Sequence, residues 1–273
     1  MTAETLSGPT GTGAFRPPQL RAASFKDSAR KVGLPILFGL LVLSAWELAV
    51  HVYGIRPTLL PPPSQIIREI VRNHEILLQN TVPTTVETVA GFLLSVVLGG
   101  LLGILLSYSR LAREALYPNV ILFQLIPKVA IAPLFMVWLG IDWQARVSIA
   151  LFIAFFPIVI STTTGLNAVD PALLRLCRSL TASQWQTFIQ VRLPSSLPFI
   201  FNGMKISMTF ALIGVIVAEF ITSQSGLGYI ILFAGSQLNT AVVMAAIILL
   251  CIVGLLLYGC VALAEHLVMQ KYG

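Results

Sequence analysis

Charge is what this sequence has least of. Asp, Glu, Lys and Arg make up 10% of its residues, whereas a soluble domain carries roughly 25%. Hydrophobic residues account for 56% of the chain, and the mean hydropathy is +0.88. This composition excludes an ordinary soluble domain and predicts an integral membrane protein.

Cysteine and the usual catalytic motifs are also sparse. The three cysteines, Cys177, Cys251 and Cys260, lack metal-ligand spacing, so we interpret them as small buried hydrophobes without a disulfide framework. The glycine-rich run from Gly8 to Gly13 is not followed by Gly-Lys-Ser/Thr, and it is therefore not a phosphate-binding loop. The sequence also contains no metal-ligand cluster and no Ser/His/Asp set at suggestive spacing. We expect no catalysis, no metal and no cofactor on this chain.

Long apolar runs are present instead, each close to the ~20 residues that cross a bilayer as a helix. Residues 1–31 are rich in Ser, Thr, Gly and Pro and predict a disordered tail, whereas 32–273 predict a transmembrane domain. The expected fold class is all-α, a polytopic bundle of about six spans. These spans are Leu34–Tyr53, Val86–Tyr108, Leu116–Leu139, Val147–Leu166, Pro198–Ile221 and Val242–Leu267.

Smaller features refine this bundle. Ser64 follows three prolines and can cap an amphipathic surface helix over Gln65–Asn73. The run Tyr229–Phe233 is too short to span the membrane. Gly99 and Gly103 form a G-x-x-x-G pair, which lets a second helix approach closely, although glycine is also simply common in membrane helices.

A polar stretch from Asp170 to Pro194 interrupts the spans, and its arginines exclude it from hydrocarbon. Asp170 followed by Pro171 is an N-cap and first helical residue. Thr181 and Gln184 have the spacing of a capping box. We expect two short helices that meet at a bend near Leu180. Such a capped hairpin between two spans suggests that a partner docks on it.

The distribution of basic residues predicts the orientation, because cytoplasmic loops carry an excess of Lys and Arg. With six spans, both termini and the polar stretch lie on one side, which we assign to the cytoplasm. That side holds Arg16, Arg21, Lys26, Arg30, Lys31, Arg110, Arg113, Arg175, Arg178, Arg192 and Lys271, and the other side holds only Arg56, Arg68, Arg72 and Arg146.

The polar stretch resembles the cytoplasmic loop of ABC importer permeases, with its pattern Glu-Ala-Ala, three residues, Gly, nine residues, Ile-x-Leu-Pro. Arg175-Leu176-Cys177 stand at Glu-Ala-Ala, Thr181 stands at the Gly, and Val191 to Pro194 match Ile-x-Leu-Pro. Thus the acidic residue is replaced by Arg175 and the glycine by Thr181. The wider sequence is similar to the nitrate/sulfonate/taurine/bicarbonate branch over about Leu59 to Leu267, in the runs VDPALLRLCRSLTAS (169–183), LPPPS (60–64), IPKVAIAPLFMVWLGI (126–141) and VAEFITSQSGLGYII (217–231).

The resemblance implies a type I importer permease of MetI-like architecture in a bacterial inner membrane, with the loop 167–195 as its coupling segment. It implies separate ATPase subunits that hold ATP and magnesium, a second and identical permease copy, and an extracytoplasmic solute-binding protein. No nucleic-acid partner is implied. The solute is a small anion such as nitrate or a sulfonate, although related permeases also carry pyrimidine-like and aromatic acids.

The resemblance also implies that a short helix, Ala182 to Gln190, enters a groove of the ATPase. Trp185, Phe188 and Ile189 would be its apolar anchors. The alternative is an ordinary cytoplasmic loop folded on itself. The candidate coupling residues are Arg175, Arg178, Ser179, Leu180, Thr181, Ala182, Ser183, Gln184, Trp185, Phe188 and Pro194.

Ionisable residues inside spans are costly and suggest function. Lys128 lies roughly 18 Å into the third span, between Pro127 and Pro133. It either attracts anions to a central pathway, together with Lys205, or bonds the carbonyls freed by the prolines. Glu219 either shapes an outer gate or is an incompletely buried interface carboxylate. The candidate pathway and gate residues are Pro127, Lys128, Lys205, Glu219, Gly226 and Gly228.

Two other classes of function remain to be separated from an importer. A secondary transporter or channel would need no ATPase and would show paired interrupted helices in two halves, whereas only the third span is strongly interrupted. An intramembrane enzyme would need a catalytic pair within the spans, and the sequence offers none.

Overall fold

The computed structural model describes residues 25–222 and 224–272, and it divides into two compact units, Met1–Ala49 and Val50–Gly273. Residues 1–24 of the predicted tail lie outside the described residues. The rest of that tail belongs to helix α1 (Phe25–Val52), so helix begins earlier than expected. The boundary between the units falls inside α1 rather than at residue 32.

Helix α1 confirms the first predicted span. Its segment Gly33–Val52 is long and apolar enough to cross a membrane. The side chains of this segment are mostly large and apolar, Leu37, Phe38 and Leu41 among them. A helix that is apolar over most of its circumference is suited to lipid.

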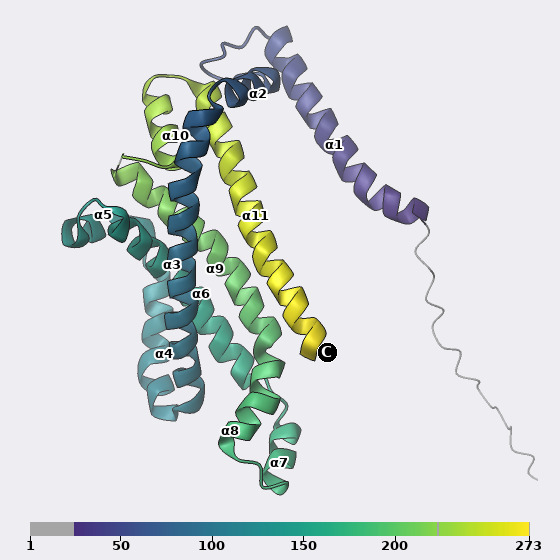
Figure 1. The fold of residues 1–273 in the computed structure, drawn as a ribbon, viewed down its shortest axis with the longest axis vertical. Helices are drawn as coiled ribbons and strands as arrows, with labels where there is room; N and C mark the ends of the chain where they lie inside the picture. The colour runs from purple at the N-terminus through teal and green to yellow at the C-terminus, as the bar shows by residue number, and fades with distance from the viewer. Residues whose placement is uncertain (1–24, 223, 273) are drawn as a thin grey trace, which may run out of the picture. The chain divides into compact units, whose positions relative to one another are not determined.

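The second unit is built from helices alone within the part of the chain that the structure describes (Figure 1). The long helices α3, α6, α9 and α11 confirm four more predicted spans, and α3 begins at His74, well before the predicted Val86. The elements are α2 (Pro63–Arg72), α3 (His74–Tyr108), α4 (Arg110–Leu125), α5 (Lys128–Leu139), α6 (Trp143–Asn167), α7 (Pro171–Ser179), α8 (Gln184–Thr187), the π-helical segment Phe188–Arg192, α9 (Leu193–Thr222), α10 (Leu227–Ser236) and α11 (Thr240–Tyr272).

Helix α6 forms the core, because it packs along both α3 and α9. A Cβ placed on Gly91 of α3 would lie 2.6 Å from the Ala150 Cβ of α6, and one on Gly103 would lie 2.6 Å from the Thr162 Cβ. Gly99 meets Ile158 in the same way, at 3.0 Å. The close approach expected from the G-x-x-x-G pair is therefore confirmed.

The third predicted span is not one helix. Helices α4 and α5 are bent by 98° at a break between Leu125 and Lys128. Pro127 occupies the N-cap position of α5 in an extended conformation. It has no N–H to continue a helix, and its ring disfavours helical geometry in the preceding residue. The described helices thus give five spans, or six if this bent pair counts as one.

Two short helices lie near the end of the unit where α3 begins. Helix α2 starts at Pro63, with Pro62 as its N-cap residue, so the predicted cap at Ser64 is wrong. Helix α10 has ten residues, which confirms that this segment is too short to span. The α7 and α8 helices follow the other end of α6 and precede α9, so they lie opposite α10 (Figure 1).

Candidate functional site: a helical hairpin and a buried polar network

The polar stretch forms a hairpin of two short helices, α7 and α8, that we call the α7–α8 hairpin (Asp170–Pro194). Asp170 caps α7, since its Oδ1 accepts a hydrogen bond from the Ala172 N–H at 2.7 Å. Pro171 is the first helical residue. Because these signals are local, the sequence predicted this helix start correctly.

The bend between the helices is a Schellman motif centred on Thr181. The Ala182 N–H donates to the Cys177 carbonyl, and the Thr181 N–H donates to the Arg178 carbonyl, each at 3.0 Å. Thr181 has a φ of 53°, in the left-handed region that glycine usually supplies at this position. The glycine of the importer pattern therefore has a geometric reason, and here a β-branched residue adopts that strained conformation.

The capping box begins at Ser183 rather than at Thr181. The Ser183 Oγ accepts a hydrogen bond from the Gln186 N–H at 3.1 Å, and the Gln186 Oε1 accepts one from the Ser183 N–H at 2.8 Å. The prediction of a box formed by Thr181 and Gln184 is wrong, because the Schellman turn places Thr181 before the cap. Its hydroxyl does not provide the cap that was expected of it.

Replacing Thr181 with glycine is expected to stabilise the bend by about 1 kcal/mol, because a left-handed conformation costs an L-residue about 1–2 kcal/mol and glycine little. Hydrogen exchange at the Thr181 and Ala182 amides should slow accordingly. Thr181→Ala, which keeps the unfavourable φ, is the matched control and should gain less stability. Faster hydrogen exchange in Thr181→Gly than in the unaltered protein would contradict the claim that Thr181 is strained.

The apolar anchors of the hairpin divide into two kinds. The Phe188 ring packs against Tyr108 of α3, with centroids 5.6 Å apart, and against Trp185 at 5.8 Å. Phe188 therefore fixes the hairpin to its own chain. Trp185 is 70% exposed, and Ile189 is also exposed, so these two can meet a partner.

The rest of the predicted coupling set lies along the same hairpin, from α7 to the start of α9. The predicted helix Ala182–Gln190 is instead the single turn α8 followed by the π-helical segment, which leads into α9 at Leu193. Ala182 and Pro194 are half-buried, whereas the exposed members of the set are Arg175, Arg178, Ser179, Leu180, Thr181, Ser183 and Gln184.

Lys128 opens helix α5 directly after the sharp bend at Pro127. Its Nζ lies 5.2 Å from the ring centre of Phe156 in α6 and 5.7 Å from that of Phe210 in α9. Within residues 25–222 and 224–272, the ammonium group makes these two cation–π contacts and no hydrogen bond to a carbonyl oxygen. The interpretation that Lys128 bonds freed carbonyls therefore finds no contact in its favour.

Lys205 does not join Lys128. Its ammonium group forms an ion pair with Glu265 of α11, and both side chains are partly exposed. The two lysines thus have different partners, and the pair between Lys205 and Glu265 was not predicted.

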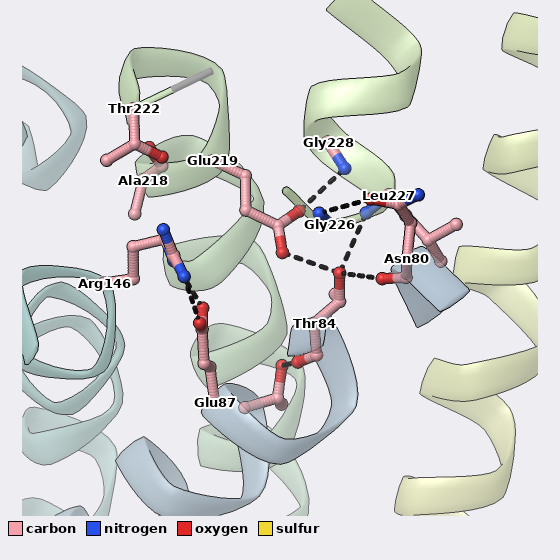
Figure 2. A network of polar contacts seen from close by, with 11 residues as sticks. Asn80, Thr84, Glu87, Arg146, Ala218, Glu219, Thr222, Gly226, Leu227 and Gly228 are labelled. Atoms are coloured by element: carbon pink, nitrogen blue, oxygen red, sulfur yellow. Dashed lines mark hydrogen bonds and ion pairs between the residues drawn. The ribbon is translucent and has the colours of Figure 1, made fainter. Parts of the chain in front are cut away.

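Glu219 is fully buried near the end of α9, so the prediction of an incompletely buried interface carboxylate is wrong. Figure 2 shows its carboxylate directed toward the start of α10 and toward Thr84 of α3. The Gly228 N–H donates to Oε2 at 2.7 Å, and the Thr84 hydroxyl donates to Oε1 at 2.6 Å. Glu219 therefore ties α10 to both α9 and α3.

The start of α10 is also held directly by two α3 side chains, Thr84 and Asn80. The Leu227 N–H donates to the Thr84 Oγ, and the Gly226 N–H donates to the Asn80 Oδ1, each at 2.9 Å (Figure 2). Gly226 has a φ of 100°, and a Cβ on it would overlap the Glu219 carboxylate. Glycine is thus required here for both conformation and space.

A buried ion pair, missed at the sequence level, appears in the same view. The Arg146 Nε and Nη2 of α6 donate to the two carboxylate oxygens of Glu87 on α3, at 2.7 and 2.5 Å (Figure 2). Both side chains are buried. Arg146 was only counted among the basic residues on the non-cytoplasmic side, and Glu87 was not singled out. An acidic residue inside an apolar run was the available signal.

Comparison with known proteins identifies relatives along most of the chain. Residues 95–269 match the family described as binding-protein-dependent transport system inner membrane component. The formylaminopyrimidine transport permease protein ThiX of Halalkalibacterium halodurans is 31% identical over 86% of this chain and 94% of its own length. The putative aliphatic sulfonates transport permease protein SsuC of Bacillus subtilis is 32% identical, covering 85% and 84% respectively.

A solved structure supports the fold. The inward-facing methionine ABC transporter MetNI contains a chain that aligns with a TM-score of 0.62, over 73% of this chain and 97% of that one. At 22% sequence identity, this likeness concerns the fold alone.

Proposed function

This chain belongs to the family of binding-protein-dependent transport system inner membrane components, and we propose that it couples a partner ATPase to solute import through the α7–α8 hairpin. It is a multi-pass inner-membrane permease of an ABC transporter, and its family is one of transport subunits, not enzymes. The observation that carries the proposal is the capped hairpin, held to the bundle by Phe188 and Tyr108, with Trp185 left exposed.

The coupling mechanism uses the rigidity of this hairpin. Two ATPase subunits close on ATP and magnesium, which this chain does not bind, and each carries one hairpin with it. Because α7 follows α6 and α8 leads into α9, a displacement of the hairpin acts directly on the two most closely packed spans. The bundle then alternates between inward-open and outward-open states as rigid bodies. The energy enters through the ATPase's different affinity for the two states.

The proposal places the hairpin and the N-terminus in the cytoplasm, in accord with the distribution of basic residues. A second, identical permease completes the pathway. The solute-binding protein docks on the opposite side, where the network around Glu219 holds the start of α10 against α3. This network fixes the shape of the outer gate that the binding protein meets.

The proposed solute is a small anion, and Lys128 attracts it. The ammonium lies between two aromatic rings, and neither ring neutralises its charge. The bend at Pro127 brings it to the first turn of α5, where the N–H groups of a helix also favour anions. Relatives named for aliphatic sulfonates and for taurine accord with an anion, and the relative named for formylaminopyrimidine marks the alternative.

Lys128→Met is expected to raise the KM for an anionic solute roughly ten- to a hundredfold, because a charge-assisted contact contributes about 1.5–3 kcal/mol. Uptake of radiolabelled taurine and of an alkanesulfonate would measure this. Lys271→Met, the same change at the exposed end of α11, is the matched control. An unchanged KM in a normally assembled Lys128→Met transporter would contradict the role of Lys128.

Co-purification tests the partner directly. An ATPase subunit expressed with this permease should remain bound through size-exclusion chromatography in detergent. A permease that is folded and monodisperse but retains no ATPase would contradict the proposal.

A further inference from the structure

The α7–α8 hairpin contains a small polar pocket of about 110 Å³. Its wall includes Arg178 at the end of α7, Gln184 and Thr187 of α8, Arg192, and Tyr108 of α3. A water molecule needs only about 10–15 Å³ of such space, so the pocket can hold several waters and has ample room for a carboxylate group. The wall presents guanidinium, amide and hydroxyl groups, all of which can donate hydrogen bonds.

The two arginines of the pocket have no carboxylate partner among the residues that the structure describes. Arg192 lies over the Tyr108 ring, with its guanidinium carbon 5.3 Å from the ring centre. Asp170 is the only acidic residue between 168 and 195, and its side chain caps α7. Glu114, on the helix that follows Tyr108, pairs with Arg110. The pocket is therefore a site of uncompensated positive charge.

Positive-inside topology explains why arginines occur in this loop, but it does not require two of them to converge on one pocket. Two guanidinium groups on a short hairpin repel each other unless an anion lies between them. The hairpin supplies no such anion itself, so the partner that docks on it is expected to bring one.

We propose that an acidic side chain of the partner ATPase enters this pocket and is held between Arg178 and Arg192. This inference rests on the proposed function and adds the chemistry of the docking surface. Guanidinium groups bind carboxylates through paired, charge-assisted hydrogen bonds. Trp185 and Leu180 are each 70% exposed. Once the ATPase has docked, their apolar contact with it excludes water from the ion pair.

The pocket gives the pairing between permease and ATPase its specificity. An ATPase with a basic or apolar residue at the facing position would leave the two guanidinium groups buried without a counter-charge, which is strongly unfavourable. The surface therefore selects an ATPase whose docking groove is acidic.

Charge reversal at Arg178 tests the inference. The dissociation constant of the co-expressed ATPase would be measured on the full-length permease in nanodiscs of neutral lipid. Arg178→Glu is expected to weaken binding at least 30-fold, and Arg178→Gln somewhat less, because the partner's carboxylate would be left buried without its counter-charge. Arg110→Glu, the same reversal on an exposed residue outside the pocket, should leave the affinity unchanged.

A compensating change identifies the partner group. Some Asp→Arg or Glu→Arg substitution in the ATPase groove should restore binding to Arg178→Glu while weakening binding to the unaltered permease. Wild-type affinity of Arg178→Glu, with binding still lost in Trp185→Ala, would overturn the acidic pocket and leave the docking itself intact.

Two further outcomes would also overturn the inference. If the defect of Arg178→Glu appears only in nanodiscs of anionic lipid, the pocket binds a lipid headgroup instead. If the ATPase fails to bind even the unaltered permease, the proposed function fails as well.

Discussion

Arg146→Met is expected to lower the free energy of unfolding by about 3–5 kcal/mol, because it leaves the Glu87 carboxylate buried without its counter-charge. Glu87→Met is expected to lower the free energy of unfolding equally, since it leaves the Arg146 guanidinium buried without a counter-charge. The geometry supports a large effect: both side chains are buried, and two hydrogen bonds of 2.5 and 2.7 Å join them. The pair joins α3 to α6 close to the outer-gate network, so its loss should also loosen the start of α10.

The double variant Glu87→Met/Arg146→Met separates the pair from its packing. Removing both charges should recover most of the lost stability, since apolar side chains of similar volume can replace a buried ion pair. Thermal unfolding in detergent measures this, with the single variants roughly 10 °C below wild type. Arg56→Met, on an exposed loop residue, is the control. A double variant as unstable as either single variant would show that size and shape, not charge pairing, govern the site.

Trp185→Ala is expected to weaken ATPase binding about 30-fold, because an exposed tryptophan at the centre of an interface typically contributes 2 kcal/mol or more. The variant should fold normally, since Trp185 is 70% exposed and Phe188 retains its contact with Tyr108. In reconstituted transporters, ATP-driven uptake should fall in parallel with ATPase binding.

Trp143→Ala is the matched control for that experiment. It removes an exposed tryptophan at the start of α6, at the other end of this helix from the hairpin. Its ATPase affinity should equal that of wild type. Loss of binding in both variants would indicate general damage to the bundle. Wild-type affinity in Trp185→Ala would show that Trp185 does not anchor the ATPase.

Local signals in the sequence were sufficient for much of the fold. Asp170 and Pro171 predicted the start of α7 because an N-cap depends only on neighbouring residues. Gly99 and Gly103 predicted close helix packing, since a missing Cβ matters to any helix that approaches. Local spacing was ambiguous at the second cap, where Thr181-x-x-Gln184 and Ser183-x-x-Gln186 both fit the pattern, and the left-handed conformation of Thr181 decided between them.

The buried network could not be predicted in the same way. Glu87 and Arg146 are 59 residues apart in sequence, and Thr84 and Glu219 are 135 apart. Pairings at that separation depend on how the helices pack, which hydropathy does not encode. The interruption of the third span at Pro127 was predicted, but its angle of 98° was not, because a proline can kink a helix or end it, and the sequence alone does not distinguish the two.

The most direct test of the central claim is uptake into proteoliposomes that contain this permease, the ATPase and the solute-binding protein. ATP and magnesium on the ATPase side should drive accumulation of a radiolabelled sulfonate, and a sodium or proton gradient without ATP should drive none. Uptake that follows an ion gradient in proteoliposomes lacking the ATPase would contradict the account and identify a secondary transporter or channel.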